Sequence, residues 1–435
     1  MLRNIATLQV GGSLVAISTL VGTIGVAHVL GARDQGLLIV AIQLYSLFFF
    51  LVGLGLVTIV VSEIASASAR GEVGRVATWL GFLVKCHLGL TVILVVGGWF
   101  LLPWATDVWR SYSPNVDPRV ATWAWWLTFM PLVDLPRTAA YAAFQGTRRM
   151  VAFAKLENGM EVARVFLVIG GAILTGSPAG AVLGTLATTA VGSVVGIELY
   201  RRARRDEGYP LPGVRAILAA IVHAPLRRGL WMGLRLGVMR QLDAVVVNIL
   251  PPLFIINFTS AQWVTYFRIA RSIMNLPRMF LQGISRTLLP ALAELKGLRD
   301  EERFRRTYLK VSLIGGGLVS VGILACLPFV RPVVGLLFPA DYAEPVWRLA
   351  LILALAYVIS SFAVSLNAFY LLTGQLGIGV AINLVAAVFG VSMTFYLCWR
   401  LPETGAAWGQ VCSLGTVILH YVYIPWYFHR RRSAA

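Results

Sequence analysis

The chain has 435 residues, of which 58% are hydrophobic and 13% charged, a composition too apolar for a soluble domain. Its formal net charge is +18, from 37 lysines and arginines against 19 aspartates and glutamates. The four cysteines stand singly inside apolar runs, without metal-ligand spacing or the pattern of a disulfide framework. We therefore expect an all-α polytopic membrane protein without a metal, a cofactor or catalytic residues. We expect its positive charge to reflect membrane topology and not nucleic-acid binding.

Twelve apolar runs are long enough to cross a bilayer, because about 20 helical residues span the hydrocarbon. They lie near residues 5–30, 36–61, 77–102, 120–143, 157–176, 180–200, 229–251, 262–292, 309–330, 346–371, 376–398 and 405–427. The runs predict about twelve transmembrane helices in two pseudo-symmetric six-helix bundles. Residues 1–200 form an N-terminal lobe, 201–228 a basic cytoplasmic linker, and 229–435 a C-terminal lobe. Such an internal repeat is typical of transporters.

The basic residues divide unequally between alternate loops. One set of loops, together with both termini, holds 22 lysines and arginines. The opposite set holds only Arg33, Arg110, Arg119, Arg331, Arg348 and Arg400. The positive-inside rule therefore places both termini in the cytoplasm. Some of the cytoplasmic arginines are also expected to hold anionic lipid head groups.

The first spans carry three local features. An apolar run of about 25 residues follows Arg3 without a convincing cleavage site, so we predict a first spanning helix and not a signal peptide. A tight external turn is expected at Gly31, Arg33, Asp34 and Gly36. Lys85 lies inside the third predicted helix. It can either snorkel to the interface or line a cavity, and both interpretations stay open.

The fourth predicted helix carries a charged pair. Asp134 and Arg137 lie about one turn apart and can pair. Pro131 and Pro136 bracket them and are expected to break or kink the helix at membrane depth. Interrupted helices often mark transporter sites, but a self-neutralising pair is also a common structural device. Arg137 is therefore a candidate binding residue, and Asp134 a candidate ion-coupling residue, with the structural alternative open.

The basic linker contains several prolines and one short apolar stretch. Residues Ile217 to Val222 are expected to form a short helix on the cytoplasmic surface.

The seventh and eighth predicted helices are rich in arginine. At about 100° per residue, the eighth helix places its polar side chains within an arc of roughly 80°. These side chains are Arg268, Arg271, Asn275, Arg278, Gln282 and Arg286. The seventh helix adds Arg235, Arg240 and Asp243.

A centrally placed arginine costs about 2.5–3.5 kcal/mol on insertion scales, so these side chains must face water, protein or an anion. Six arginines against one acid favour a phosphate-bearing ligand in a cationic cavity. Snorkelling from the helix ends is the alternative for Arg286 and Arg235. Asp243 is a second candidate for ion coupling.

Several degenerate motifs occur in a characteristic order along the chain. They are GARDQGLLIV after the first span, RQLDAVVVNIL with Asp243, TYFRIARSIMNLP with LLPALAEL, VVGLLFPADYAEPVWRLALIL, and GAAWGQVCS. In this order the chain resembles polysaccharide flippases of the Wzx or polysaccharide-transporter type. That family belongs to the MOP exporter superfamily, with the MATE transporters and the lipid II flippases. The family's usual vGxY after the seventh span is replaced here by VTYF, a local departure.

The resemblance implies two six-helix bundles around a cationic central cavity that works by alternating access. It implies a substrate with an oligosaccharide on a polyprenyl pyrophosphate such as undecaprenyl pyrophosphate, moved from the cytoplasmic to the outer leaflet of a bacterial inner membrane. Glycosyltransferases and a polymerase of the same pathway are the implied partners, together with membrane lipids. The sequence contains no Walker motif, so ATP is not expected to drive transport directly.

Two alternatives belong to other classes. A MATE-type antiporter of small molecules or ions shares the fold, but its cavity calls for acids where this chain has arginines. A membrane glycan polymerase or ligase also handles polyprenyl pyrophosphates. Such an enzyme normally needs a sizeable external loop, whereas the external loops here have about 20 residues or fewer.

Overall fold

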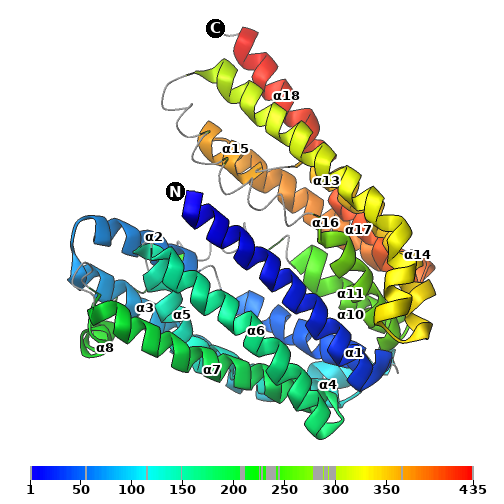
Figure 1. Cartoon of the computed structure of the whole chain (residues 1–435), viewed down its shortest axis with the longest axis horizontal. Coiled ribbons are helices and arrows are strands. Elements are labelled where there is room, and N and C mark those ends of the chain that lie inside the picture. Colours follow the sequence, from blue (N-terminus) through cyan, green and yellow to red (C-terminus); the bar gives the residue numbers. More distant parts are fainter. Residues whose placement is uncertain are drawn as a thin grey trace. The chain divides into compact units, whose positions relative to one another are not determined.

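A computed structural model describes residues 2–53, 56–113, 116–147, 149–205, 211–224, 229–231, 245–277, 300–363 and 366–433, with residues 226, 242, 288 and 292. These residues form helices joined by short turns, and no strand occurs among them (Figure 1). Eight of the described helices are long and apolar enough to cross a membrane. The prediction of an all-α multi-span membrane fold is confirmed, but the number of twelve spans is not.

The chain divides into two compact units, Met1–Gln241 and Leu242–Ala435. The predicted lobes 1–200 and 229–435, joined by a linker at 201–228, stay a prediction. The described helices of the first unit are α1 (Leu2–Gly53), α2 (Leu56–Ala69), α3 (Val73–Tyr112), α4 (Arg119–Leu127), α5 (Met130–Gly146), α6 (Met150–Thr175), α7 (Pro178–Arg205) and α8 (Val214–His223).

The predicted tight turn is present inside α1. Gly31 has φ +72° and ψ 174°, a backbone conformation that glycine adopts without the strain other residues meet. The Gln35 side-chain amide donates a hydrogen bond to the Thr23 carbonyl at 3.1 Å. Residues twelve apart lie about 18 Å apart along a straight helix. The two arms of α1 therefore fold back against each other at Gly31.

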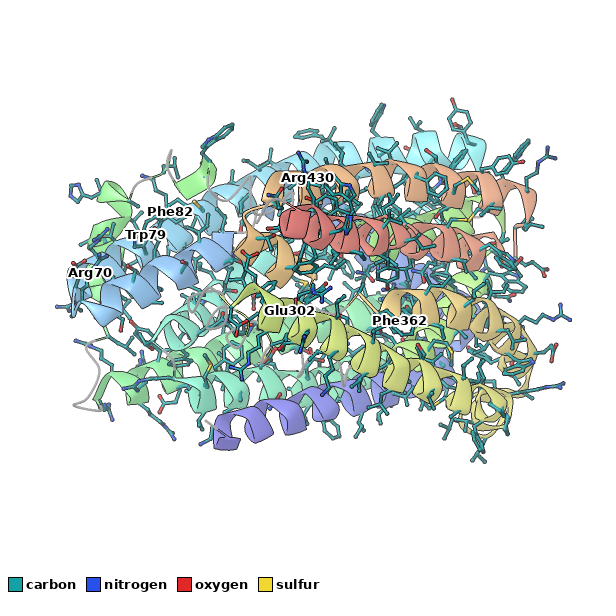
Figure 2. All side chains as sticks on the ribbon, turned by 90° about the horizontal axis from the view of Figure 1, so that it is seen from above. Arg70, Trp79, Phe82, Glu302, Phe362 and Arg430 are labelled. Carbon is teal, nitrogen blue, oxygen red and sulfur yellow. The ribbon has the colours of Figure 1, made fainter. Side chains whose placement is uncertain are left out.

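Large side chains and close helix contacts together stabilise the first unit. Phe82 on α3 and Phe144 on α5 are fully buried, and Trp79 meets Phe82 edge to face at 5.5 Å (Figure 2). Between α6 and α7, a Cβ on Gly180 would lie 2.1 Å from the carbonyl oxygen of Gly171. The backbones of α6 and α7 thus approach each other in the manner of small-residue packing in membranes.

The described elements of the second unit are η1 (Val245–Ile249), α10 (Leu250–Phe258), α11 (Ala261–Asn275), α13 (Glu301–Leu337), η2 (Ala340–Tyr342), α14 (Ala343–Ser361), α15 (Leu366–Thr373), α16 (Leu376–Arg400), α17 (Gly405–Gly415) and α18 (Ile418–Ser433). Helix α14 packs against α11, α13 and α17. Phe362 follows α14 and lies against Gly316 of α13, where a Cβ would come within 2.6 Å of its ring (Figure 2). This packing fixes the position of α11.

A proline defect near the start of the second unit is repaired from a distant helix. Neither Pro251 nor Pro252 has an N–H, so the Val247 carbonyl has no backbone donor four or five residues ahead. The side-chain amide of Gln410 on α17 donates to this carbonyl at 2.7 Å, and Gln410 is 1% exposed. Val247 lies in the π-helical turn η1, immediately ahead of α10. Gln410 therefore pairs with an irregular stretch of backbone inside the second unit.

Replacing Gln410 by methionine is expected to destabilise the second unit. The change leaves the buried Val247 carbonyl unpaired, which costs about 1–3 kcal/mol. The buried Oε1 of Gln410 has no partner among the described residues, and its removal returns part of that cost. We expect a net loss of about 1 kcal/mol, measured as a lower midpoint of thermal unfolding in detergent.

A double-variant cycle isolates this hydrogen bond. In a Pro251→Ala, Pro252→Ala background, a backbone N–H is available four and five residues after Val247, so Gln410→Met should cost less there. Gln262→Met serves as the control, because Gln262 is an exposed glutamine on α11. An equal cost of Gln410→Met in both backgrounds would show that Gln410 acts through packing alone.

Candidate functional site

Helix α11 carries the described part of the arginine-rich stripe. It begins after Ser260, whose backbone is extended, and ends at Asn275, two residues before Pro277. Its apolar side chains, such as Phe267 and Ile269, are buried, whereas Arg268, Arg271 and Asn275 are partly buried. No acid occurs in α11. Two guanidinium groups are thus held on a helix that is otherwise packed inside the second unit.

Arg271 reaches towards helix α14. Its Nε donates to the hydroxyl of Tyr357 at 3.3 Å, and Tyr357 is 1% exposed. Among the residues that the structure describes, no carboxylate lies within salt-bridge distance of Arg271. Because an arginine has five N–H donors, this bond leaves most of the guanidinium fork available for an anion.

A group of aromatic residues lies near the start of α11. Trp263 meets Tyr266 edge to face at 5.7 Å, and Tyr266 meets Tyr342 at 5.2 Å. The Tyr266 hydroxyl also donates to a carboxylate oxygen of Asp341 at 3.4 Å. Trp263 is partly buried and lies eight residues before Arg271, about 12 Å along the helix.

Sequence reasoning missed Tyr357, Trp263, Tyr266 and Asp341. Tyr357 is 86 residues from Arg271 in an unremarkable apolar run, so no sequence signal points to it. Trp263 and Tyr266 lie on the same helix as Arg268 and Arg271, and this closeness in sequence could have identified them as candidate site residues. Six predicted site residues, namely Arg235, Arg240, Asp243, Arg278, Gln282 and Arg286, lie outside the described residues.

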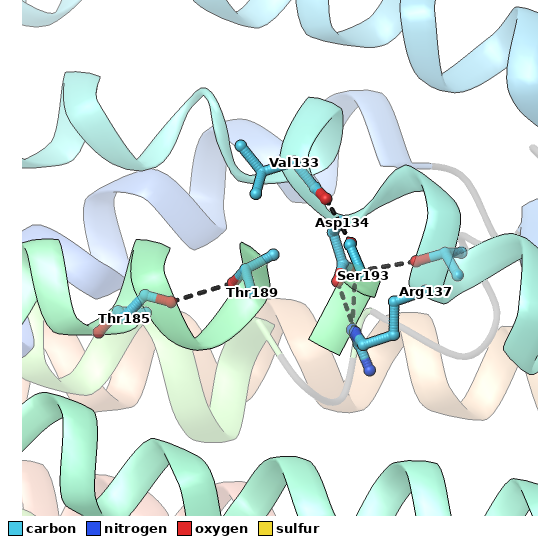
Figure 3. A network of polar contacts seen from close by, with 7 residues as sticks. Val133, Asp134, Arg137, Thr185, Thr189 and Ser193 are labelled. Carbon is cyan, nitrogen blue, oxygen red and sulfur yellow. Dashed lines mark hydrogen bonds and ion pairs between the residues drawn. The ribbon is translucent and has the colours of Figure 1, made fainter. Parts of the chain in front are cut away.

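The other predicted residues belong to the first unit, where Asp134 and Arg137 form the expected ion pair on α5. The two nitrogens Nε and Nη2 of Arg137 donate to the two carboxylate oxygens of Asp134 at 2.5 and 2.7 Å. The Thr138 hydroxyl donates to Asp134 Oδ2 at 2.8 Å. The pair is therefore bidentate, and Arg137 contacts both carboxylate oxygens of Asp134 (Figure 3).

Helix α7 supports this pair from one side. A Cβ on Gly192 would lie 2.8 Å from Cδ of Arg137, and one on Gly196 would lie 3.1 Å from its Cα. The Ser193 hydroxyl donates to the Val133 carbonyl at 2.5 Å (Figure 3). Helix α5 is therefore fixed to α7 on both sides of Asp134.

The structure places the break in the fourth predicted helix at Pro131 and not at Pro136. Helix α4 ends at Leu127 and α5 begins at Met130, whereas α5 continues through Pro136. Proline is well suited to the first turn of a helix, where its missing N–H has no intrahelical partner. The helix is therefore not broken at Pro136, and a kink there stays a prediction.

Lys85 lies on α3 between buried and partly buried neighbours and is itself partly buried. In the described part of the chain, no carboxylate pairs with it. Lys85, Asp134 and Arg137 thus belong to the first unit, and Arg268, Arg271 and Asn275 to the second.

Comparisons with known proteins connect this geometry to a family. The family model described as "Polysaccharide biosynthesis protein" matches residues 1–296. None of the curated proteins matches the chain.

The solved structures of three MOP-type proteins are similar to the chain in fold. An inward-facing multidrug resistance MATE transporter is 16% identical, with a TM-score of 0.71 over 94% of this chain and 93% of that one. The lipid II flippase MurJ is 11% identical, with a TM-score of 0.69 over 95% and 86%. A MOP superfamily transporter from Pyrococcus furiosus, described as having a binding pocket of reverse polarity, is 17% identical, with a TM-score of 0.62 over 97% and 94%.

These likenesses show the fold, and the family model covers about two thirds of the chain. The chain is a multi-span membrane protein with the MOP fold, and it belongs to the polysaccharide biosynthesis protein family.

Proposed function

We propose that the chain is a flippase for polyprenyl-pyrophosphate-linked oligosaccharides. In this proposal the cationic face of α11 binds the pyrophosphate while the head group crosses the membrane. The carrying observation is Arg271, a partly buried guanidinium whose described partner is the Tyr357 hydroxyl and not a carboxylate. Membership of a polysaccharide biosynthesis family supports the glycan part of the substrate.

The chemistry of the substrate matches this arrangement. A pyrophosphate and its sugars cannot cross about 30 Å of hydrocarbon unaided, whereas a polyprenyl tail can stay in the lipid. A guanidinium fork binds phosphate oxygens through parallel N–H bonds, and such bonds are strong where water is excluded. Tyr357 accepts from Nε of Arg271, and no other described residue pairs with this guanidinium, so its two terminal nitrogens can point at the phosphate.

The aromatic group at the start of α11 suits the sugar end of the same head group. Trp263 is partly buried and can present its ring, Asp341 is exposed and can present its carboxylate, and the buried Tyr266 contacts both. Trp263 lies roughly 12 Å from Arg271 along the helix, so one extended head group can reach both side chains. We therefore place the pyrophosphate at Arg271 and the first sugars towards Trp263.

The other parts of the proposed mechanism rest on the sequence analysis. The candidates for ion coupling are Asp134 and Asp243. The further candidates for the cationic cavity are Arg268, Asn275, Arg278, Gln282, Arg286, Arg235, Arg240, Lys85 and Arg137. Transport runs by alternating access from the cytoplasmic to the outer leaflet of a bacterial inner membrane, with both termini cytoplasmic. Glycosyltransferases and a polymerase supply and consume the substrate.

Reconstitution into liposomes tests the function. The protein is given a fluorescent polyprenyl-pyrophosphate oligosaccharide, and access of an external glycosidase reports head-group crossing. We expect protein-dependent crossing of the unaltered substrate and no uptake of a cationic dye. Dye transport without head-group crossing would identify a MATE-type antiporter. Longer glycan products without crossing would identify a polymerase.

A further inference from the structure

A short helix next to two membrane spans has an apolar stripe that no part of the described protein covers. Helix α8 has ten residues and a length of about 15 Å, which is too short to cross a bilayer. Val214, Leu218 and Val222 lie along one line of this helix and are 56%, 54% and 74% exposed. Only Ile217 of α8 is fully buried among the described residues.

A neighbouring side of α8 packs closely on α3 (Figure 1). A Cβ on Gly81 would lie 3.0 Å from backbone atoms of Ile217, Ala220 and Ile221. Gly81 lies eight residues after the start of α3, about 12 Å along a helix of roughly 60 Å. Because α3 is longer than the hydrocarbon is thick, this contact falls near one membrane interface and not at the centre.

The start of α8 is also tied to the end of α7. The Tyr200 hydroxyl donates to the Pro212 carbonyl at 2.8 Å, and the Arg204 guanidinium lies against Gly213. Arg149 donates to the Ala203 carbonyl at 2.8 Å. The orientation of α8 is therefore fixed by α3 and α7, which are both long enough to span the membrane.

Positive charge is concentrated in the sequence at this junction, which we call the α7–α8 elbow (residues 200–205 and 211–223). Residues 200–228 contain seven arginines and two acids. Arg202 is paired with Glu198 at 2.7 Å. Among the described residues, no carboxylate pairs with the exposed arginines 201, 205 and 215. On the helical projection Arg215 lies directly beside the line of Leu218 and Val222.

We propose that the α7–α8 elbow is a docking site for an anionic phospholipid surface. The apolar line of α8 enters the boundary between head groups and acyl chains, as in amphipathic helices that lie in the membrane plane. Arg201, Arg205 and Arg215 bind the lipid phosphates, since basic residues next to a membrane attract anionic head groups. A lipid surface accounts for both the apolar line and the flanking charge, whereas a free phosphate accounts only for the charge.

Hydrogen exchange of the full chain in lipid nanodiscs tests this site. We expect the amides of α8 to exchange about tenfold more slowly in discs of phosphatidylcholine with phosphatidylglycerol than in pure phosphatidylcholine. The triple variant Arg201→Gln, Arg205→Gln, Arg215→Gln should lose this slowing. The matched control Arg110→Gln, Arg331→Gln, Arg348→Gln removes three exposed charges elsewhere and should keep it.

Two further experiments test the contribution of the apolar line of α8 and the alternative that a free phosphate binds the elbow. Leu218→Gln with Val222→Gln replaces only exposed side chains, so the fold is preserved, and α8 should exchange faster in anionic discs. Inorganic phosphate added to neutral discs should leave the exchange unchanged. Equal exchange in neutral and anionic discs, slowing that survives the triple variant, or slowing by phosphate alone would each overturn the proposal.

Discussion

Arg271→Ala is expected to slow head-group crossing in the liposome assay by about ten- to a hundredfold. Removing the guanidinium takes away a charge-assisted, two-pronged contact with the phosphate, worth about 1.5–3 kcal/mol. If the contact with phosphate tightens during transport, the variant should have a lower crossing rate at saturating substrate. If the contact already forms when the substrate first binds, the variant should instead have a weaker apparent affinity. The measurement is the initial rate of crossing across a range of substrate concentrations.

Conservative variants separate charge from geometry at this position. Arg271→Lys keeps the charge but loses the fork and should recover only part of the rate. Tyr357→Phe removes the hydroxyl that orients the guanidinium and should reduce the rate by less than Arg271→Ala does. Arg303→Ala removes an exposed arginine from the first turn of α13 and should leave the rate unchanged. Normal crossing by a folded Arg271→Ala protein would make this arginine structural.

Most of what the sequence predicted about the fold came from hydrophobicity and from local backbone chemistry. Long apolar runs predicted a multi-span helical fold, because backbone groups in lipid must pair within a helix, although the predicted number of twelve spans is not confirmed. The turn at Gly31 was predictable because a cluster of glycine and charged residues interrupts an apolar run, and the structure shows the chain folding back there. The sequence did not show which of two nearby prolines ends a helix. In the structure, Pro131 lies in the first turn of α5, and Pro136 lies inside the same helix without ending it.

The same division between local and distant information applies to the candidate site. The Asp134–Arg137 pair was predictable, because residues three apart on a helix are neighbours whatever the fold. The partners of Arg271 and of the Val247 carbonyl were not, because Tyr357 and Gln410 lie 86 and 163 residues away. Only the tertiary packing of α11 against α14, and of η1 against α17, brings these groups together.

Asp134→Ala is expected to lower the free energy of unfolding by about 2–3 kcal/mol. The change leaves the Arg137 guanidinium, whose side chain is 28% exposed, without its carboxylate partner between α5 and α7. Breaking a fully buried pair costs about 3–5 kcal/mol, and the residual exposure of both groups reduces that figure. The measurement is the midpoint of thermal unfolding of the purified protein in detergent, compared with wild type.

The double variant Asp134→Leu, Arg137→Met tests whether this pair is a structural ion pair or whether Asp134 couples transport to an ion. It removes both charges and fills the space with apolar atoms, so it should recover most of the stability that Asp134→Ala loses. Because the double variant should be folded, its rate of head-group crossing can be compared with that of wild type in liposomes with and without a proton or sodium gradient. Crossing that still responds to the gradient would make the pair a structural link between α5 and α7. Crossing that no longer responds, at unchanged stability, would identify Asp134 as the ion-coupling carboxylate, since a bidentate arginine can release it when an ion competes for the same oxygens.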